Sequence, residues 1–118
     1  MALDRNMTQQ AITALNNLAT VAANVRGTDA ALAAIDKGIA LCEERGAVAA
    51  TIWASFTKCE ILVPAGRWDE VLELADFVIE RDAEMGGSQA RTGAAALKAI
   101  VLFYRGREAE ARHASKNA

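Results

Sequence analysis

The residues of this chain that could perform chemistry are few and scattered. Cys42 and Cys59 are the only cysteines and His113 is the only histidine, so the clustered ligands of a zinc site cannot be assembled from them. Asp69 and Glu70 form a carboxylate pair, but they stand where we expect a helix to begin, and the helix dipole favours acids there without any acid–base role. We therefore expect two buried thiols, no metal, no cofactor and no enzymatic activity.

The glycine-rich segment GGSQARTG, residues 86–93, has the composition of a phosphate-binding loop. It lacks the Gly-Lys-Ser/Thr ending with which such a loop holds the phosphates and their metal ion. We interpret the segment as a connection between two helices, in which Ser88 caps the second helix.

The composition predicts one helical domain over residues 1–118. Hydrophobic residues make up 53% of the chain, aromatic residues only 5%, and there is a single proline, which favours helices over strands. A net charge of −2 argues against nucleic acid as a direct partner. We expect no membrane partner and a cytoplasmic location, because the sequence shows neither a long apolar span nor the apolar core of a signal peptide.

The sequence aligns with itself without gaps when it is shifted by 40 residues. Glycines and apolar residues of similar size fall on one another, which predicts stacked units. We place these units at residues 8–46, 47–86 and 87–116. The matched positions include Ile12 and Ile52; Ala19, Cys59 and Ala99; Val21, Ile61 and Val101; Leu32 and Leu72; Gly46 and Gly86; Lys58 and Lys98; Gly66 and Gly106; Arg67 and Arg107; and Glu70 and Glu110.

Each unit is expected to contain two helices. Asn6 with Gln9 is typical of a capping box, and Thr28 can cap the following helix. Gly46 and the pair Gly86-Gly87 suit the left-handed residue that ends many helices, while Pro64 would stop a helix in its last turn. The apolar spacing places the helices near residues 8–25, 29–45, 48–64, 68–85, 88–105 and 107–116.

The stretch AGRWDEVLELA, residues 65–75, combines a turn with a helix start. We expect a tight turn at Ala65-Gly66-Arg67 and a Trp68 side chain that covers it and packs on a neighbouring helix. The helix that follows should bury a stripe at three- and four-residue spacing, formed by Val71, Leu72, Ala75, Val78 and Ile79.

The segment Gly66-Arg67-Trp68-Asp69-Glu70-Val71-Leu72 resembles the centre of a tetratricopeptide repeat, and the resemblance extends over about residues 8–116. The period is 40 instead of the usual ~34, and the family's aromatic residues of the first helix and its closing proline are missing. Long, degenerate repeats of this kind are similar to those of bacterial transcriptional regulators and adenylyl cyclases. The resemblance implies an all-α, right-handed stack of about three antiparallel helical hairpins, an α-solenoid; HEAT repeats remain the alternative.

The same resemblance implies a concave binding surface lined by the first helix of each unit. Its columns would be Thr13, Trp53, Gly93; Asn16, Phe56, Ala96; and Thr20, Glu60, Ile100. Trp53 and Phe56 are the sharpest candidates, because aromatic anchors dominate many interfaces, although either could belong to the core. The candidate binding residues are Thr13, Asn16, Thr20, Trp53, Phe56 and Glu60, which suit a peptide with an apolar anchor and a basic residue.

The two ends of the array differ. Arg112 stands where the earlier units have Leu32 and Leu72, and Ser115 stands where they have Ile35 and Ala75. We therefore expect a polar outer face that closes the array. Near the N-terminus the apolar pattern begins at once, with Leu3, Met7 and Ile12. This indicates either a piece of a longer protein or a face that meets a partner, such as a second copy in a homodimer.

Together these features predict a non-catalytic scaffold that binds a protein or peptide, within a signalling or transcription-regulating protein. One alternative is a structural module that forms homo-oligomers. Another is a helical array that senses a small molecule in an apolar pocket between its helices.

Overall fold

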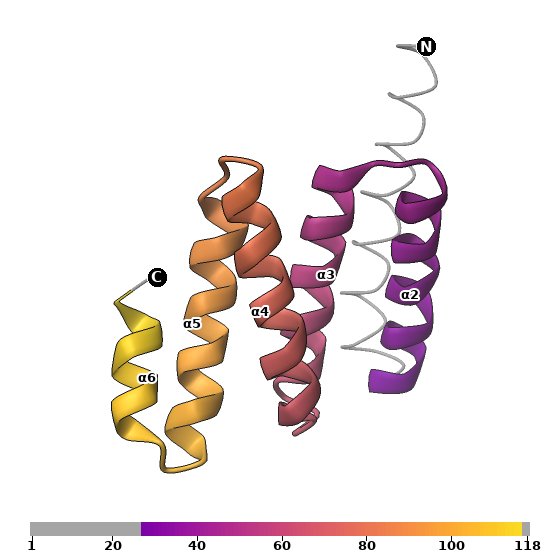
Figure 1. Ribbon diagram of the computed structural model, residues 1–118. Helices are drawn as coiled ribbons and strands as arrows, with labels where there is room; N and C mark the ends of the chain where they lie inside the picture. The colour runs from indigo at the N-terminus through magenta and orange to yellow at the C-terminus, as the bar shows by residue number, and fades with distance from the viewer. Residues whose placement is uncertain (1–26, 117–118) are drawn as a thin grey trace.

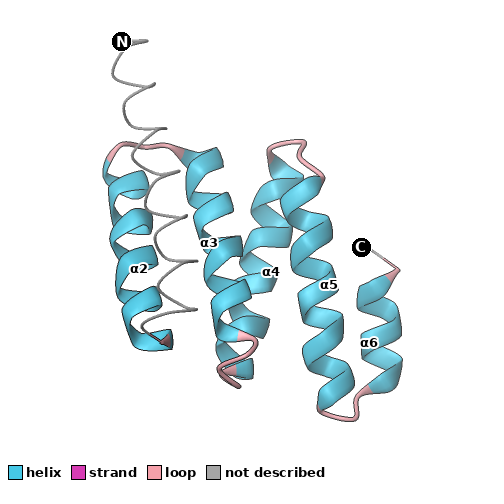
Figure 2. Cartoon of the chain, turned by 180° about the vertical axis from the view of Figure 1, so that it is seen from behind, coloured by secondary structure: helices cyan, strands magenta, loops and turns pink. Residues whose placement is uncertain are grey.

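The computed structural model describes residues 27–116, and this part of the chain is all-helical. Consecutive helices run in opposite directions and lie side by side in chain order (Figure 1), joined by short connections at their ends (Figure 2). The predicted helix near residues 8–25 and its capping box lie outside the described residues. Within the described range the helices are α2 (Thr28–Glu44), α3 (Val48–Leu62), α4 (Trp68–Glu84), α5 (Gln89–Tyr104) and α6 (Glu108–Ser115).

The turns are closed by glycines, as the sequence predicts for Gly46 and Gly86. Gly46, Gly66, Gly86 and Gly106 have φ of 66°, 73°, 74° and 77°. At the first of them the Gly46 N–H donates to the Glu43 carbonyl at 3.1 Å and the next N–H to the Cys42 carbonyl at 2.9 Å. The same pair of bonds recurs at each of the other three glycines, so every connection between described helices begins with the same helix-ending motif.

The described helices begin and end within two residues of the predicted positions. The largest difference is at α3, which ends at Leu62 and not at Pro64. The Arg67 N–H donates to the Leu62 carbonyl at 3.3 Å, so the chain has left the helix before it reaches the proline. Pro64 therefore lies in the turn and not, as predicted, in the last turn of the helix.

Both predicted hydroxyl caps in the described range are wrong. Thr28 is the first residue of α2, behind the N-cap Gly27, and its side chain makes no capping bond. Ser88 is the N-cap of α5, but its hydroxyl makes no capping bond either. The Arg91 N–H donates instead to Oδ2 of the buried Asp82, at 2.8 Å. A carboxylate at the end of α4 thus satisfies the start of α5, where the helix dipole favours negative charge.

The predicted buried stripe of α4 is largely confirmed. Val71, Ala75 and Val78 are fully buried, whereas Leu72 and Ile79 pack at the edges of the core and are partly buried. Two larger clusters form the core: one contains Ala31, Leu32, Ile35, Ala54, Ile61, Leu62, Val71 and Val101, and the other Ile52, Cys59, Ala75, Val78, Ala90 and Ala94. Many of these residues are small, which lets the helices approach closely.

Cys42 and Cys59 are both buried free thiols, as predicted. Burial raises the pKa of Cys59 to about 12, because the interior disfavours the thiolate. Burial also raises the pKa of Cys42. Cys59 of α3 packs against residues of α4 and α5, in the column that it shares with Ala19 and Ala99.

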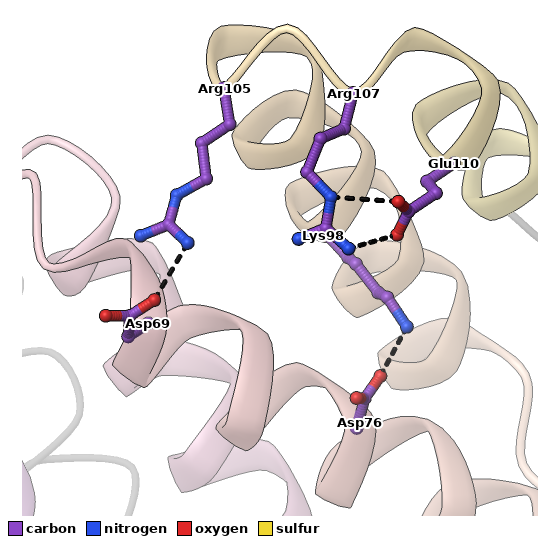
Figure 3. A network of polar contacts seen from close by, with 6 residues as sticks. All are labelled: Asp69, Asp76, Lys98, Arg105, Arg107 and Glu110. Carbon is purple, nitrogen blue, oxygen red and sulfur yellow. Dashed lines mark hydrogen bonds and ion pairs between the residues drawn. The ribbon is translucent and has the colours of Figure 1, made fainter.

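Residues that the 40-residue shift matches make the same polar contacts. Lys58 of α3 pairs with Asp36 of α2 at 2.8 Å, and Lys98 of α5 pairs with Asp76 of α4 at 2.6 Å (Figure 3). These pairs link the end of one predicted unit to the start of the next. Within the units, equivalent ion pairs join Arg67 to Glu70 and Arg107 to Glu110.

Trp68 covers the α3–α4 turn, as predicted. Its indole N–H donates to the Val63 carbonyl at 3.3 Å, and its ring stacks on Tyr104 of α5 with 5.8 Å between centroids. Arg105 places its guanidinium 5.9 Å from the same ring and pairs with Asp69 at 2.8 Å (Figure 3). The turn is therefore joined both to its own helix and to the next one.

Candidate binding surface

Trp53 and Phe56 form an aromatic pair on α3. Trp53 is 43% exposed, whereas Phe56 is partly buried. Their ring centroids lie 5.9 Å apart with an interplanar angle of 85°, an edge-to-face geometry that stabilises aromatic pairs. Since α3 is a regular helix here, the three-residue spacing puts both rings on one stripe. The sequence left open whether Trp53 and Phe56 belong to the binding surface or to the core. In the structure Trp53 is a surface residue and Phe56 lies at the edge of the core.

Gly93 of α5 determines where the Phe56 ring lies. A Cβ atom on Gly93 would come within 2.6 Å of both Cε2 and Cζ of Phe56, so only glycine leaves room for this ring. Phe56 also packs against the cluster that contains Ile52 and Cys59. The ring is thus held between α3 and α5, and it supports the exposed Trp53 from one side.

Glu60 lies on the exposed side of α3, one turn beyond Phe56. Loss of water around its carboxyl raises the pKa of Glu60 above the usual value. Within residues 27–116 no side chain forms an ion pair with it. A cationic group brought to this carboxylate would offset the cost of its partial desolvation.

The structure brings Trp53, Phe56 and Glu60 together on α3, and α5 continues the surface beside them. Ile100, which the sequence places in the column of Glu60, is 42% exposed. We define the α3–α5 face by these four residues and Gly93. The other candidate binding residues, Thr13, Asn16 and Thr20, lie outside the described residues.

Phe103 and Tyr104 are functional candidates that the sequence did not reveal. They are 60% and 63% exposed at the end of α5. Arg112 and Ser115 of α6 are exposed as predicted, but the predicted polar outer face did not include these two apolar rings. The signal was the run AIVLFY, residues 99–104, which is apolar all round and longer than one buried stripe requires. A groove of about 490 Å³ lies beside these rings, lined by Ala99, Ile100, Phe103, Tyr104, Glu108, Ala111, Arg112 and Ser115.

A second groove, of about 790 Å³, lies between α4, α5 and α6. Several of its charges are already neutralised inside the molecule. Lys98 of α5 pairs with Asp76 of α4, and Glu110 pairs with Arg107 at the start of α6 (Figure 3). These contacts leave those charges little capacity to bind a charged ligand.

Comparison with family models, curated proteins and solved structures gives no significant match. Among the described helices, none combines the length and the apolar character needed to span a bilayer. Within the same range, no three His, Cys, Asp or Glu side chains are grouped as they would be to hold a metal ion.

Proposed function

We propose that this chain is a non-catalytic protein-binding module, built as a right-handed stack of tetratricopeptide-like helical hairpins. The recurrence of the Lys58–Asp36 contact as Lys98–Asp76, 40 residues later, supports the repeat. The four identical glycine turns support it as well. In such a stack the first helices of successive hairpins line one surface, and the described members of that set are α3 and α5.

The observation that carries the proposed function is the exposed Trp53 beside the fixed Phe56 ring and Glu60, which forms no ion pair within residues 27–116. An exposed tryptophan supplies a large, rigid apolar contact, and tryptophan is enriched among residues that dominate binding energy. Glu60 adds a carboxylate that favours a cation. The ligand that fits is therefore a peptide segment with an apolar anchor and a Lys or Arg near it.

The proposal can be tested by panning a random peptide library, displayed on phage, against the full chain. Enriched peptides should share an aromatic or aliphatic residue and a basic residue at fixed separation. Trp53→Ala should weaken the binding of a synthetic copy of an enriched peptide at least about tenfold, since a hot-spot truncation removes ~2 kcal/mol or more. Glu60→Lys should weaken it as well, and more strongly at low salt.

Phe77→Ala is the matched control, because Phe77 is a similarly exposed aromatic residue, at 39%, on α4. It should leave the affinity unchanged. A library that yields no shared sequence, or a peptide whose affinity ignores both α3 substitutions, would contradict the proposed site. Leu72 of α4 packs against the core, so Leu72→Ala shows the effect of a core truncation. A Trp53→Ala variant that unfolds as readily as Leu72→Ala would also contradict the proposed site, because Trp53 would then be part of the core.

Self-association is the second candidate function, and the exposed rings of Phe103 and Tyr104 favour it. These rings lie outside the α3–α5 face, so self-association through them leaves Trp53 and Glu60 open.

A further inference from the structure

The groove beside α5 and α6 has an internal counterpart, and there the chain itself fills it. Forty residues before Ala99, Ala111 and Ser115 stand Cys59, Val71 and Ala75. Cys59 and Ala75 pack against Ala90 and Ala94 of α5, and Val71 packs in a cluster with Val101 of α5. Within residues 27–116, no helix covers on the α5–α6 hairpin the surface that α5 covers on the α3–α4 hairpin, and the shape of this groove suits a helix.

The open surface also exposes large apolar side chains in one stripe. Ile100, Phe103 and Tyr104 follow the three- and four-residue spacing of a helix face and are 42%, 60% and 63% exposed. Three such neighbours mark a contact surface more strongly than scattered apolar residues do. Aromatic side chains at the centre of an interface commonly carry most of its binding energy.

The residues of α6 that take the places of two α4 acids argue against a helix that resembles α5. α5 is held on α4 through Lys98 to Asp76 and Arg105 to Asp69. The positions 40 residues after these two aspartates are Lys116 and Ala109. A helix with the basic residues of α5 would therefore find a lysine and an alanine in place of both acids.

The charged residues that line the groove are one acid and one base, so the groove of one copy can complement the groove of a second copy. Glu108 and Arg112 stand four residues apart on α6, both exposed and both at the groove. In the described part of the chain neither forms an ion pair with another side chain. In a two-fold interface, when a first residue of one copy contacts a second residue of the other copy, the reverse contact also forms. Each Glu108 can then face the Arg112 of the other copy.

We propose that the α5–α6 groove is the interface of a two-fold homodimer. Phe103 of each copy enters the groove of the other, between Ala99 and Ala111, and two symmetric Glu108–Arg112 pairs flank the apolar centre. This interface is separate from the α3–α5 face except at its border residue Ile100, so a dimer leaves Trp53 and Glu60 open to a peptide.

Sedimentation equilibrium of the full chain, from micromolar to millimolar concentration, tests the dimer. We expect a concentration-dependent monomer–dimer equilibrium. Phe103→Glu should raise the dissociation constant about a hundredfold, because it places a charge at the apolar centre twice per dimer. Met85→Glu is the control, since Met85 is 57% exposed at the end of α4, away from the groove, and it should leave the constant unchanged. Circular dichroism checks that both variants stay helical.

A charge exchange tests the two-fold arrangement itself. Glu108→Arg and Arg112→Glu should each weaken self-association about tenfold, because each replaces two attractive pairs by two repulsive ones. An equimolar mixture of the two variants should form a heterodimer with nearly the original affinity, since both pairs are then restored. The double variant should dimerise like the unaltered chain. This recovery cannot come from a general loss of stability.

Three results would overturn the proposal. The first is a chain that stays monomeric at every concentration, even if it binds a synthetic peptide of residues 88–105, because the groove would then serve a partner helix. The second is a dimer that Phe103→Glu does not weaken, which would place the interface on another face. The third is a mixture of the charge variants that associates no better than either variant alone.

Discussion

Gly87→Ala tests how the α4–α5 connection is built. Gly87 is not among the glycines with positive φ, so its backbone is open to alanine. At such a site the change to alanine ordinarily stabilises a protein by ~0.4–1 kcal/mol, because it restricts the unfolded chain. Here the new Cβ would lie 2.1 Å from Oδ1 and 2.7 Å from Cγ of Asp82. These distances are far below van der Waals contact, so the carboxylate would have to move.

The loss can be worked out from the contact that Asp82 makes. Its carboxylate is buried and accepts the Arg91 N–H at 2.8 Å. A hydrogen bond to a charged group contributes ~1.5–3 kcal/mol, and displacement of the carboxylate would leave the first turn of α5 without this cap. After subtracting the gain from the unfolded state, we expect Gly87→Ala to lower the free energy of unfolding by ~1–2 kcal/mol.

Urea unfolding followed by far-UV circular dichroism measures this change, provided that the slope with denaturant stays constant. Asp82→Ala supplies the second side of a double-mutant cycle. In that background the added methyl group finds space, so Gly87→Ala should be neutral or stabilising. A coupling of about 2 kcal/mol is expected between the two sites. Gly87→Ala with unchanged or higher stability in the unaltered chain would refute this account, as would strict additivity.

The remaining predictions concern the core, a thiol and a carboxyl. Leu72→Ala should lower the free energy of unfolding by ~2 kcal/mol, at the low end of the range for buried leucines because the side chain is only partly buried, and a loss well under 1 kcal/mol would mean that its assigned packing is wrong. Cys59, with its pKa near 12, should resist a thiol reagent such as DTNB in the native protein and react at once in guanidinium chloride; rapid native labelling of Cys59, located by mass spectrometry, would contradict its burial. Folding raises the pKa of Glu60, so ionisation of this carboxyl lowers the free energy of unfolding. The protonated carboxyl therefore contributes its full stability below the pKa of Glu60 in the unfolded chain, and this contribution is lost as the pH rises through the pKa in the folded state. Glu60→Gln should therefore stabilise the protein at neutral pH relative to the unaltered chain, and the difference should vanish in acid. If Glu60→Gln stabilised the protein only in acid, the direction assigned to the pKa shift would be wrong.

The ends of α2, α3, α4 and α5 were predictable because a glycine gives each of them a local signal. Glycines such as Gly46 and Gly86 end helices through bonds to carbonyls a few residues earlier, so the necessary information lies within one turn of chain. The apolar spacing of Val71, Ala75 and Val78 identifies the buried side of α4 for the same reason. Because these signals are local, the predicted helix ends agree with the described ones to within two residues.

The caps and the exposed rings were not predictable in this way. Asp82 caps α5 from the end of the preceding helix, and a local pattern favours the adjacent Ser88 instead. Periodicity also shows which residues share a face, but not whether another element covers that face. Trp53 and Phe56 share one stripe, yet Gly93 of a different helix makes the difference in their burial. Phe103 is exposed because no described helix covers the side of α5 on which it lies.

The order of helix packing has a kinetic consequence. Among the described helices, contacts join chain neighbours, and the one other pair is α3 with α5. Native contacts are therefore close in sequence, the loops that must close are short, and little chain entropy is lost before packing begins. We expect rapid folding that can start at any neighbouring pair and spread along the chain. The eight-residue α6, which packs on α5 alone among these helices, should join last and exchange its amide hydrogens first.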